Sequence, residues 1–311
     1  MTILITRHDK IGDFITALPM CKVLKEQTSH KIVMLVSKVN VSLAQELDFI
    51  DEVIEYSDDS FTLLQRINAV KPDVSISGYI DFHLGLCLFL ARIKIRIAPA
   101  TKIAQIFFNK TIKQRRSRVE KTEWQYNLDL VKEFDDNLKL EFAKPLLDDH
   151  LLKKSQIPHM HDKLVLFHTG FGGSSDGNLT LDDYLKLAKK VSHIADVMFT
   201  FGPDDDEAKI YITKQIDFSA DIRDDFKSLL DFTIFISKAK LFVSTSTGPM
   251  HLAGLTNTPT LSFFGENLFA SSKRWATISD KKFQNNFEVP KNYTNEFYDK
   301  IENKLMEIIN D

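Results

Sequence analysis

The chain has 311 residues, of which 43% are hydrophobic and 27% charged, and its formal net charge is −3. This length fits two domains of about 150 residues each, because single hydrophobic cores seldom serve a chain of this size. The slightly acidic balance argues against a general nucleic-acid binder, whose surface would be strongly basic.

The start of the chain and its cysteines favour a cytoplasmic protein. No basic segment followed by a long apolar core opens the sequence, so we expect no signal peptide. No apolar stretch reaches the roughly 18 residues that a membrane-spanning helix needs. The two cysteines, Cys21 and Cys87, lie in apolar stretches and are expected to be buried thiols in a reducing compartment.

Short apolar runs alternate with amphipathic stretches along the first half of the chain. Buried strands are predicted at residues 3–5, 32–36, 53–56 and 74–76. Helices are predicted between and after them at residues 13–26, 41–47, 61–70 and 83–91. This alternation predicts a parallel sheet with helices on both faces, joined by right-handed crossovers.

The same alternation resumes after residue 163. Strands are predicted at residues 164–167, 197–201, 241–243 and 260–263. Helices are predicted at residues 181–191, 204–215, 229–237 and 249–255. We therefore expect an α/β fold of two doubly wound, Rossmann-like domains in tandem.

A polar, irregular stretch at 145–162 is typical of a linker between the two series. The expected N-terminal domain covers residues 1–155, and the expected C-terminal domain covers residues 160–290. The remaining residues, 291–311, contain an amphipathic helical pattern. We expect that helix to pack on a domain, with a return to the first domain as one option.

The stretch TRHDKIGDFITALP joins the first predicted strand to the first predicted helix. Gly12 permits close approach of a ligand to the backbone, and Asp13 falls in the first turn of the helix. A carboxylate there can simply complement the helix dipole, or it can act as a general base. The neighbouring Arg7, His8 and Lys10 would keep Asp13 ionised or bind an anionic substrate.

A glycine-rich loop, FHTGFGGSSDGNLTLDDY, follows the first strand of the second half. Its backbone N–H groups and hydroxyls are suited to phosphate. The candidate phosphate-binding residues are Thr169, Gly170, Gly173 and Ser174. The loop matches neither the Walker pattern nor G-x-G-x-x-G, so an ordinary strand–helix connection explains it equally well.

A third loop, FVSTSTGPMHLAGLTNTPTLSFFG, contains the end of a strand and the start of a helix. A helix N-terminus preceded by several hydroxyl groups is well suited to a diphosphate. The candidate diphosphate-binding residues are Ser246, Thr247, Gly248, Pro249, Met250 and His251. A histidine in the first helical turn is also commonly a packing residue, and the helix dipole disfavours its charged form.

These three loops, in this order, resemble glycosyltransferase family 9, the ADP-heptose–lipopolysaccharide heptosyltransferases. RHDKIGDFITALPMCKVLK is similar to the family's opening Gly-Asp segment with its Pro and following Leu-Lys. STGPMHLAGLTNTPTLSFFG is similar to its Thr-Gly-Pro-x-His-x-Ala…Thr-Pro…Phe-Gly signature, and the glycine-rich loop stands where the family has its donor loop.

The resemblance implies a GT-B architecture, with two Rossmann-like domains facing a central cleft, and inverting transfer from a nucleotide-sugar without a metal or other cofactor. Asp13 then matches the family's general base, which deprotonates the acceptor hydroxyl. The Thr247–His251 motif would hold the donor diphosphate, and ADP-heptose is the donor that the family implies. The implied acceptor is an anionic, lipid-linked saccharide of the lipopolysaccharide inner core.

Two departures from the family pattern leave the donor open. Ser246 stands where many members carry an acidic residue, and the second loop lacks the Lys that commonly contacts the donor phosphates. Backbone N–H groups with Ser174 could replace that Lys, or Lys273 and Arg274 could supply the charge. The alternatives are a transferase using another nucleotide-sugar and a non-catalytic nucleotide-binding relative, although an intact Asp13 counts against the latter.

Five basic residues crowd one segment of the first domain: Lys110, Lys113, Arg115, Arg116 and Arg118. The segment is either a solvated basic loop or a surface that attracts an anionic acceptor and the membrane carrying it. In the second case Arg115 and Arg116 bind acceptor together with Lys10 and Gly12. We then expect peripheral contact with the cytoplasmic face of the inner membrane.

An acidic run follows Pro203 in the second domain, at residues 204–207. Proline and acidic residues in this order are typical of a helix N-terminus, where the dipole favours negative charge. We therefore assign no metal site to it.

Overall fold

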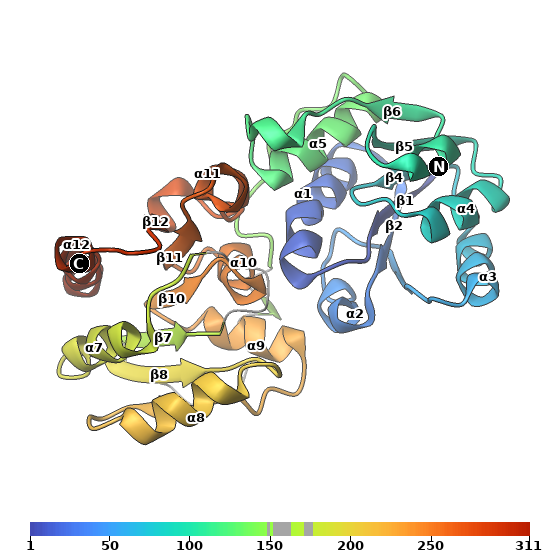
Figure 1. Ribbon diagram of the computed structural model, residues 1–311. Helices are drawn as coiled ribbons and strands as arrows, with labels where there is room; N and C mark the ends of the chain where they lie inside the picture. The colour runs from blue at the N-terminus through green and yellow to red at the C-terminus, as the bar shows by residue number, and fades with distance from the viewer. Residues whose placement is uncertain (148–149, 152–162, 171–176) are drawn as a thin grey trace. The chain divides into compact units, whose positions relative to one another are not determined.

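Two parallel six-stranded sheets organise the chain, one in each of two units, Met1–Asp148 and Asp149–Asp311 (Figure 1). The computed structural model describes residues 1–147, 150–151, 163–170 and 177–311. The predicted site residues Gly173 and Ser174 lie outside these ranges. Each unit is described by itself.

Unit 1 alternates strands and helices from its first residues onward. Its strands are β1 (Thr2–Arg7), β2 (Lys31–Val36), β3 (Glu52–Glu55), β4 (Val74–Ser77), β5 (Ile95–Pro99) and β6 (Lys110–Ile112). Its α-helices are α1 (Ile11–Gln27), α2 (Val41–Ala44), α3 (Ser60–Val70), α4 (Phe82–Leu90) and α5 (Glu123–Phe134). Short 3₁₀ turns complete it: η1 (Lys38–Asn40), η2 (Ile103–Phe107) and η3 (Arg116–Arg118).

The strands of unit 1 lie in the order β3-β2-β1-β4-β5-β6, all parallel. Helices α3 and α4 share a hydrophobic core with one face of this sheet, and α1 packs against β1, β2 and α5. The chain reverses its direction of winding between β1 and β4. In such sheets, ligands bind beyond the carboxyl ends of the strands at this switch point.

Unit 2 repeats the alternation. Its strands are β7 (Leu164–His168), β8 (Asp196–Thr200), β9 (Asp221–Ile222), β10 (Leu241–Thr245), β11 (Thr260–Gly265) and β12 (Gln284–Val289). Its helices are α7 (Leu181–Val191), α8 (Asp206–Gln215), α9 (Leu229–Ile236), α10 (Gly248–Leu255), α11 (Ser272–Trp275) and α12 (Asn295–Asn310). The 3₁₀ turns are η4 (Leu268–Ala270) and η5 (Lys281–Phe283).

The strand order of unit 2 is β12-β11-β10-β7-β8-β9, which is the order of unit 1 read from the opposite edge. The strands again pair in parallel, and the switch point lies between β7 and β10. Both units therefore follow the doubly wound order that the sequence pattern predicts.

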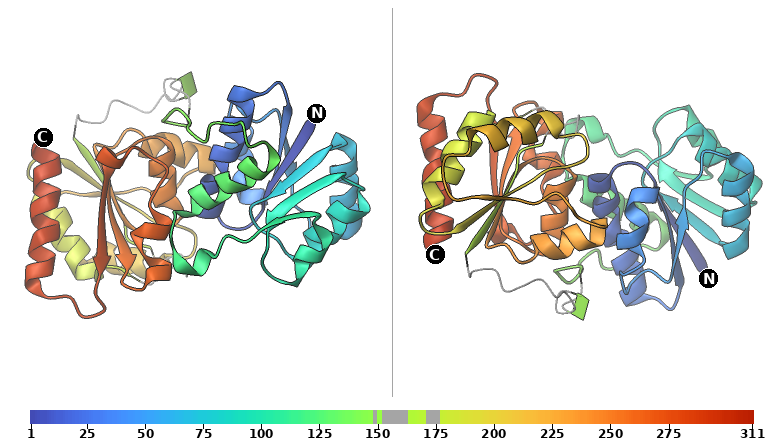
Figure 2. Two further views of the ribbon diagram at one scale, coloured as in Figure 1. Left: turned by 90° about the horizontal axis from the view of Figure 1, so that it is seen from above. Right: turned by 90° about the horizontal axis from the view of Figure 1, so that it is seen from below.

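The C-terminal helix α12 belongs to unit 2. Its stripe of Ile301, Leu305 and Ile309 is fully buried in the hydrophobic core of that unit. Figure 2 shows α12 running alongside α7, and Lys190 of α7 pairs with Glu302 at 2.9 Å. The helix therefore packs on unit 2 through this stripe.

Several elements were not predicted from the sequence: β5, β6, β9, β12, α5 and α11. The basic residues around β6 interrupt any apolar pattern, so this edge strand resembles a loop in the sequence. The helix predicted at 41–47 is shorter in the structure, where α2 ends at Ala44. Cys21 and Cys87 are buried free thiols, as predicted.

Candidate active site

Asp13 lies at the switch point of unit 1. Strand β1 ends at Arg7, and helix α1 begins at Ile11, so the carboxylate stands in the first helical turn. Its partner is the guanidinium of Arg7, whose Nη2 donates to Asp13 Oδ1. The helix dipole favours a carboxylate here. The ion pair with Arg7 gives this carboxylate a fixed position in addition.

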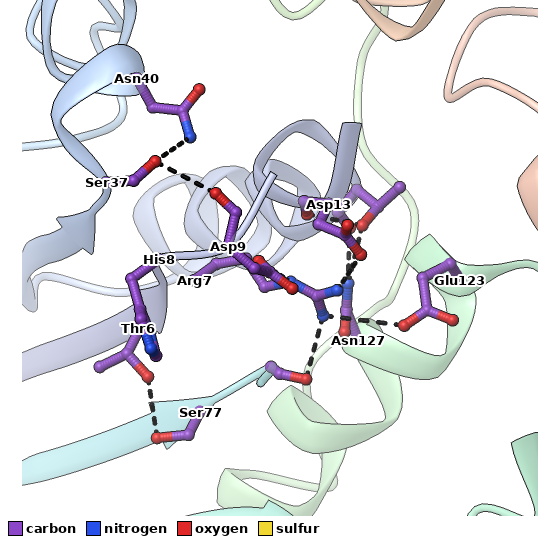
Figure 3. Close-up of polar contacts among 12 residues, drawn as sticks. Thr6, Arg7, His8, Asp9, Asp13, Ser37, Asn40, Ser77, Glu123 and Asn127 are labelled. Carbon is purple, nitrogen blue, oxygen red and sulfur yellow. Dashed lines mark hydrogen bonds and ion pairs between the residues drawn. The ribbon is translucent and has the colours of Figure 1, made fainter. Parts of the chain in front are cut away.

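Arg7 is the centre of a buried charge cluster (Figure 3). It is only 3% exposed; its Nε donates to Asp9 Oδ1 at 2.8 Å and its Nη1 to the Gly78 carbonyl at 3.0 Å. Glu123 Oε1 lies 3.7 Å from the same Nη1. Burial by itself would lower the pKa of Arg7, but the three carboxylates outweigh it and raise that pKa above its usual value. Arg7 therefore remains charged throughout.

The same cluster shifts the titration of Asp13. Burial, the largest influence, raises the pKa of its carboxyl, the charge of Arg7 lowers it, and the charges of Asp9 and Glu123 raise it again. The resulting pKa is about 6. A base with a pKa close to neutral can accept a proton and still be ionised at working pH.

Glu123 and Arg116 extend the cluster from a distant part of the sequence. Glu123 begins α5, is 2% exposed, and receives a hydrogen bond from Arg116 Nη1. Arg116 Nε donates to Gln114 Oε1 at 2.8 Å. Asn127, one turn further along α5, donates to the Thr16 carbonyl of α1 at 3.0 Å. Helix α5 thus supports the first turns of α1, and sequence spacing alone could not have identified Glu123 or Asn127.

The partners of His8 differ from those of Asp13. Its ring stacks on Tyr56 with centroids 4.2 Å apart, and its Nε2 lies 2.7 Å from Asp81 Oδ2. Lys10 is exposed. Of the three basic residues expected to keep Asp13 ionised, Arg7 alone is its ion-pair partner, and burial outweighs even that charge. With a pKa of about 6, the Asp13 carboxyl is still largely ionised at neutral pH.

The four predicted acceptor-binding residues occupy different environments. Gly12 is buried in the first turn of α1 beside Asp13, and Lys10 is exposed just before it. Arg115 is exposed, whereas Arg116 is half-buried and paired with Glu123. Arg116 therefore belongs to the Asp13 cluster, and reversing its charge would disturb the base as well as any acceptor contact.

The switch point of unit 2 carries hydroxyl groups and a helix N-terminus. Strand β10 ends at Thr245, and α10 begins at Gly248 with Pro249 in its first turn. The Thr245 hydroxyl donates to the Gly177 carbonyl at 2.6 Å, which ties β10 to the end of the glycine-rich loop. Ser246 and Gly248 are half-buried, and Thr247 is 7% exposed. The N-terminus of α10 can bind an anion through backbone N–H groups.

Several polar atoms at this edge are buried without a hydrogen-bond partner among the described residues. They are the hydroxyls of Thr169 and Ser244 and the Nδ1 atom of His251. Buried polar groups are normally satisfied, because an unpaired one costs free energy. Such groups at the carboxyl ends of β7 and β10 are consistent with a polar ligand.

His251 is 3% exposed, and burial lowers its pKa to about 4, so its imidazole is neutral. Met250 is fully buried and belongs to the core. Arg274, suggested as a source of positive charge, is buried with its guanidinium 3.6 Å from the Phe269 ring centroid, whereas Lys273 is exposed.

Sequence reasoning did not identify a buried pair near the same edge. His168 ends β7, its Nδ1 lies 3.0 Å from Thr200 Oγ1, and its Nε2 lies 3.8 Å from Asp205 Oδ2. Burial lowers the pKa of His168 to about 4. Asp205 belongs to the acidic run, but it accepts a hydrogen bond from Gly202 N at 2.7 Å and lies against Gly170. Helix α8 begins one residue later, so only part of that run lies in its first turn.

Known proteins resemble this chain in sequence and in fold. The family model for glycosyltransferase family 9 (heptosyltransferase) matches residues 88–304. A Haemophilus influenzae protein named as a glycosyltransferase is 35% identical over 299 residues, covering 89% of this chain and 86% of that protein.

Two Escherichia coli structures match the fold over nearly the whole chain. ADP-heptose lps heptosyltransferase II has a TM-score of 0.80 at 14% identity, covering 99% of this chain and 98% of that one. Heptosyltransferase WaaC with ADP has a TM-score of 0.76 at 15% identity, covering 99% and 100%. The identities are low, so these two matches concern the fold, and they confirm the predicted α/β, GT-B class.

Proposed function

The chain belongs to glycosyltransferase family 9, and from this premise we propose that it moves a heptose from ADP-heptose to an anionic, lipid-linked saccharide of the lipopolysaccharide inner core. Glycosyl transfer itself follows from the family. The donor, the acceptor and the residue roles below are the proposal.

The observation that carries the proposed chemistry is the Asp13 carboxyl, held by a buried arginine and shifted to a pKa of about 6. In the proposed reaction, Asp13 accepts the proton of the acceptor hydroxyl while that oxygen attacks the anomeric carbon. The bond from this carbon to the diphosphate oxygen breaks, ADP leaves, and the configuration inverts. Arg7 holds the carboxylate in place and stays charged throughout.

We assign donor binding to unit 2. The N-terminus of α10, with Thr247 and Gly248, would bind the diphosphate through N–H groups and the helix dipole. The hydroxyls of Thr169 and Ser244, which have no hydrogen-bond partner among the described residues, would gain partners in the ligand. Gly173 and Ser174 remain predicted donor contacts. The E. coli relative solved with ADP supports a nucleotide-sugar donor.

One observation supports the alternative of a different nucleotide-sugar. The described part of the donor edge presents the hydroxyls of Thr169 and Ser244 and a neutral histidine, and the family's donor-loop Lys is missing from the sequence. Recognition that relies on backbone N–H groups selects a diphosphate without selecting the sugar attached to it.

The test begins with titration of the purified protein with ADP, UDP, GDP, CMP and NAD. Preference for ADP, lost in Gly248→Val, would support the donor site, and transfer is then assayed with ADP-heptose. Preference for another nucleotide would retain the transferase and change the donor. Absence of binding to all five would contradict the proposal and favour a non-catalytic relative.

A further inference from the structure

An exposed apolar surface lies on helix α4 and turn η2 of unit 1. Its members are large hydrophobic side chains, here called the α4–η2 face: Phe82, Phe89, Leu90, Ile103 and Ile106. Ile103 is 79% exposed and Ile106 67%, and the other three are more than half exposed. Scattered apolar residues are normal on a protein surface, but a contiguous group marks an interaction site.

The members of this face are neighbours in space. The rings of Phe82 and Phe89, two helical turns apart on α4, lie 4.9 Å and 6.1 Å from the Phe107 ring of η2. Ile103 and Ile106 are three residues apart in a 3₁₀ turn, where such side chains eclipse one another. Helix α4 and η2 also pack directly together, so the two sets form one surface.

The segment that carries this face has a strong positive charge. Residues 82–119 contain nine Lys and Arg and no Asp or Glu, in a chain whose net charge is −3. The basic residues are Arg92, Lys94, Arg96, Lys102, Lys110, Lys113, Arg115, Arg116 and Arg118. Two of them flank the face directly: the Arg96 guanidinium lies 5.5 Å from the Phe89 ring centroid, and Lys102 immediately precedes Ile103.

An apolar surface with Arg92, Lys94, Arg96 and Lys102 next to its members matches an anionic lipid bilayer. The apolar side chains can enter the boundary of the acyl chains, while the cations remain at the lipid phosphates. A second copy of the chain is a poorer match, because two copies of the same positively charged segment would then face and repel each other. No helix among the described residues is long and apolar enough to cross a membrane, so such contact would be peripheral.

We infer that the α4–η2 face docks unit 1 on an anionic lipid bilayer. The inference rests on the proposed function in one respect, since a lipid-linked acceptor gives docking its purpose. The face adjoins the Asp13 loop: Asp81 caps α4 through Leu84 N at 2.8 Å, and its other oxygen pairs with His8 at 2.7 Å. Docking through α4 thus brings the base close to the membrane surface.

The test compares two double variants that add the same charge. Ile103→Glu/Ile106→Glu changes the face, and Ile194→Glu/Ile210→Glu changes two exposed isoleucines of unit 2, which are 42% and 55% exposed. Binding is measured by co-sedimentation with vesicles of phosphatidylglycerol and phosphatidylethanolamine, and with vesicles of phosphatidylcholine. We expect the unchanged protein to bind the anionic vesicles, less so at high salt, and the face variant to lose about tenfold or more in affinity. The control variant should bind as the unchanged protein does.

Three results would overturn the inference: equal binding by the two variants, absence of binding by the unchanged protein, or a dimer that only the face variant loses in light scattering. The last result would assign the face to self-association. Transfer to a delipidated, water-soluble acceptor separates the two proposals, because the face variant should retain it. Vesicle binding without any transfer by the unchanged protein would reject the proposed function and leave docking intact.

Discussion

The first strands of the two units, β1 and β7, hold the same place in the same strand order, yet their switch points differ in chemistry. After β1 the chain builds a buried cluster of charges around Arg7, and one of its carboxylates has a raised pKa. After β7 and β10 it places hydroxyls, glycines, a helix N-terminus and a neutral histidine.

This difference shows how one topology can support two tasks. A charged cluster in a buried setting can adjust the affinity of a carboxyl for a proton, which is what a base needs. Uncharged donors and a helix dipole can hold a diphosphate without titrating near neutral pH. In each unit the fold supplies the carboxyl ends of the strands as a binding position, and the residues placed there decide the chemistry.

The strongest test of the comparison is to remove the base. Asp13→Asn keeps the shape of the side chain but cannot accept the proton, so turnover should fall by about 10²–10⁴-fold. ADP affinity, measured by calorimetry, should stay the same, because the donor is assigned to unit 2. Asp9→Asn makes the same charge change in the same loop and should keep most of its turnover at neutral pH. Full activity in Asp13→Asn would remove the general-base assignment.

The second test removes the centre of the charged cluster. Arg7→Met leaves Asp9, Asp13 and Glu123 without their shared cation, and the free energy of unfolding should fall by about 3–5 kcal/mol. Urea unfolding followed by circular dichroism measures this loss.

The matched control for Arg7→Met is Arg118→Met, whose side chain is 59% exposed. It should change stability by about 0.5 kcal/mol or less. Equal effects of the two substitutions would contradict the central role of Arg7.

The third test addresses the buried Thr169 hydroxyl of unit 2. Thr169→Val replaces a buried hydroxyl that has no partner among the described residues, so the free protein should lose no stability and can gain about 1 kcal/mol. Its ADP affinity should nevertheless fall, by about tenfold, if the ligand is that partner. Thermal unfolding with and without ADP measures both effects.

Thr200→Val is the control for Thr169→Val, because the Thr200 hydroxyl already pairs with His168 at 3.0 Å. That variant should lose stability in the free protein. A loss of stability in Thr169→Val as well would mean that its hydroxyl is satisfied without a ligand.

The smallest expected effect concerns pH. With the pKa of Asp13 at about 6, kcat/KM should fall as the pH drops through that value, because the protonated carboxyl cannot act as a base. The charge of Asp9 raises this pKa, so Asp9→Asn should move the acidic limb of the profile to lower pH. A limb that stays in place, or moves upward, would show that Asp9 does not act on Asp13 through its charge.

Much of the fold could be predicted from sequence, because apolar runs and amphipathic stretches alternate at lengths typical of strands and helices. Gly12 and Asp13 stood out because a glycine and a carboxylate follow a buried strand directly. Strand β6 and helix α5 could not be predicted in this way. Basic residues interrupt the apolar pattern of the short edge strand, and the helix buries polar groups such as Glu123 and Asn127.

By itself the sequence determined the alternation of most strands and helices, the positions of the three loops, and the candidate base among them. Only the tertiary structure decided the pKa of that base. Glu123 lies far from Asp13 in the chain, and α5 brings its carboxylate to the other side of Arg7. A pKa depends on burial and on charges nearby in space, and the folding of distant segments sets both.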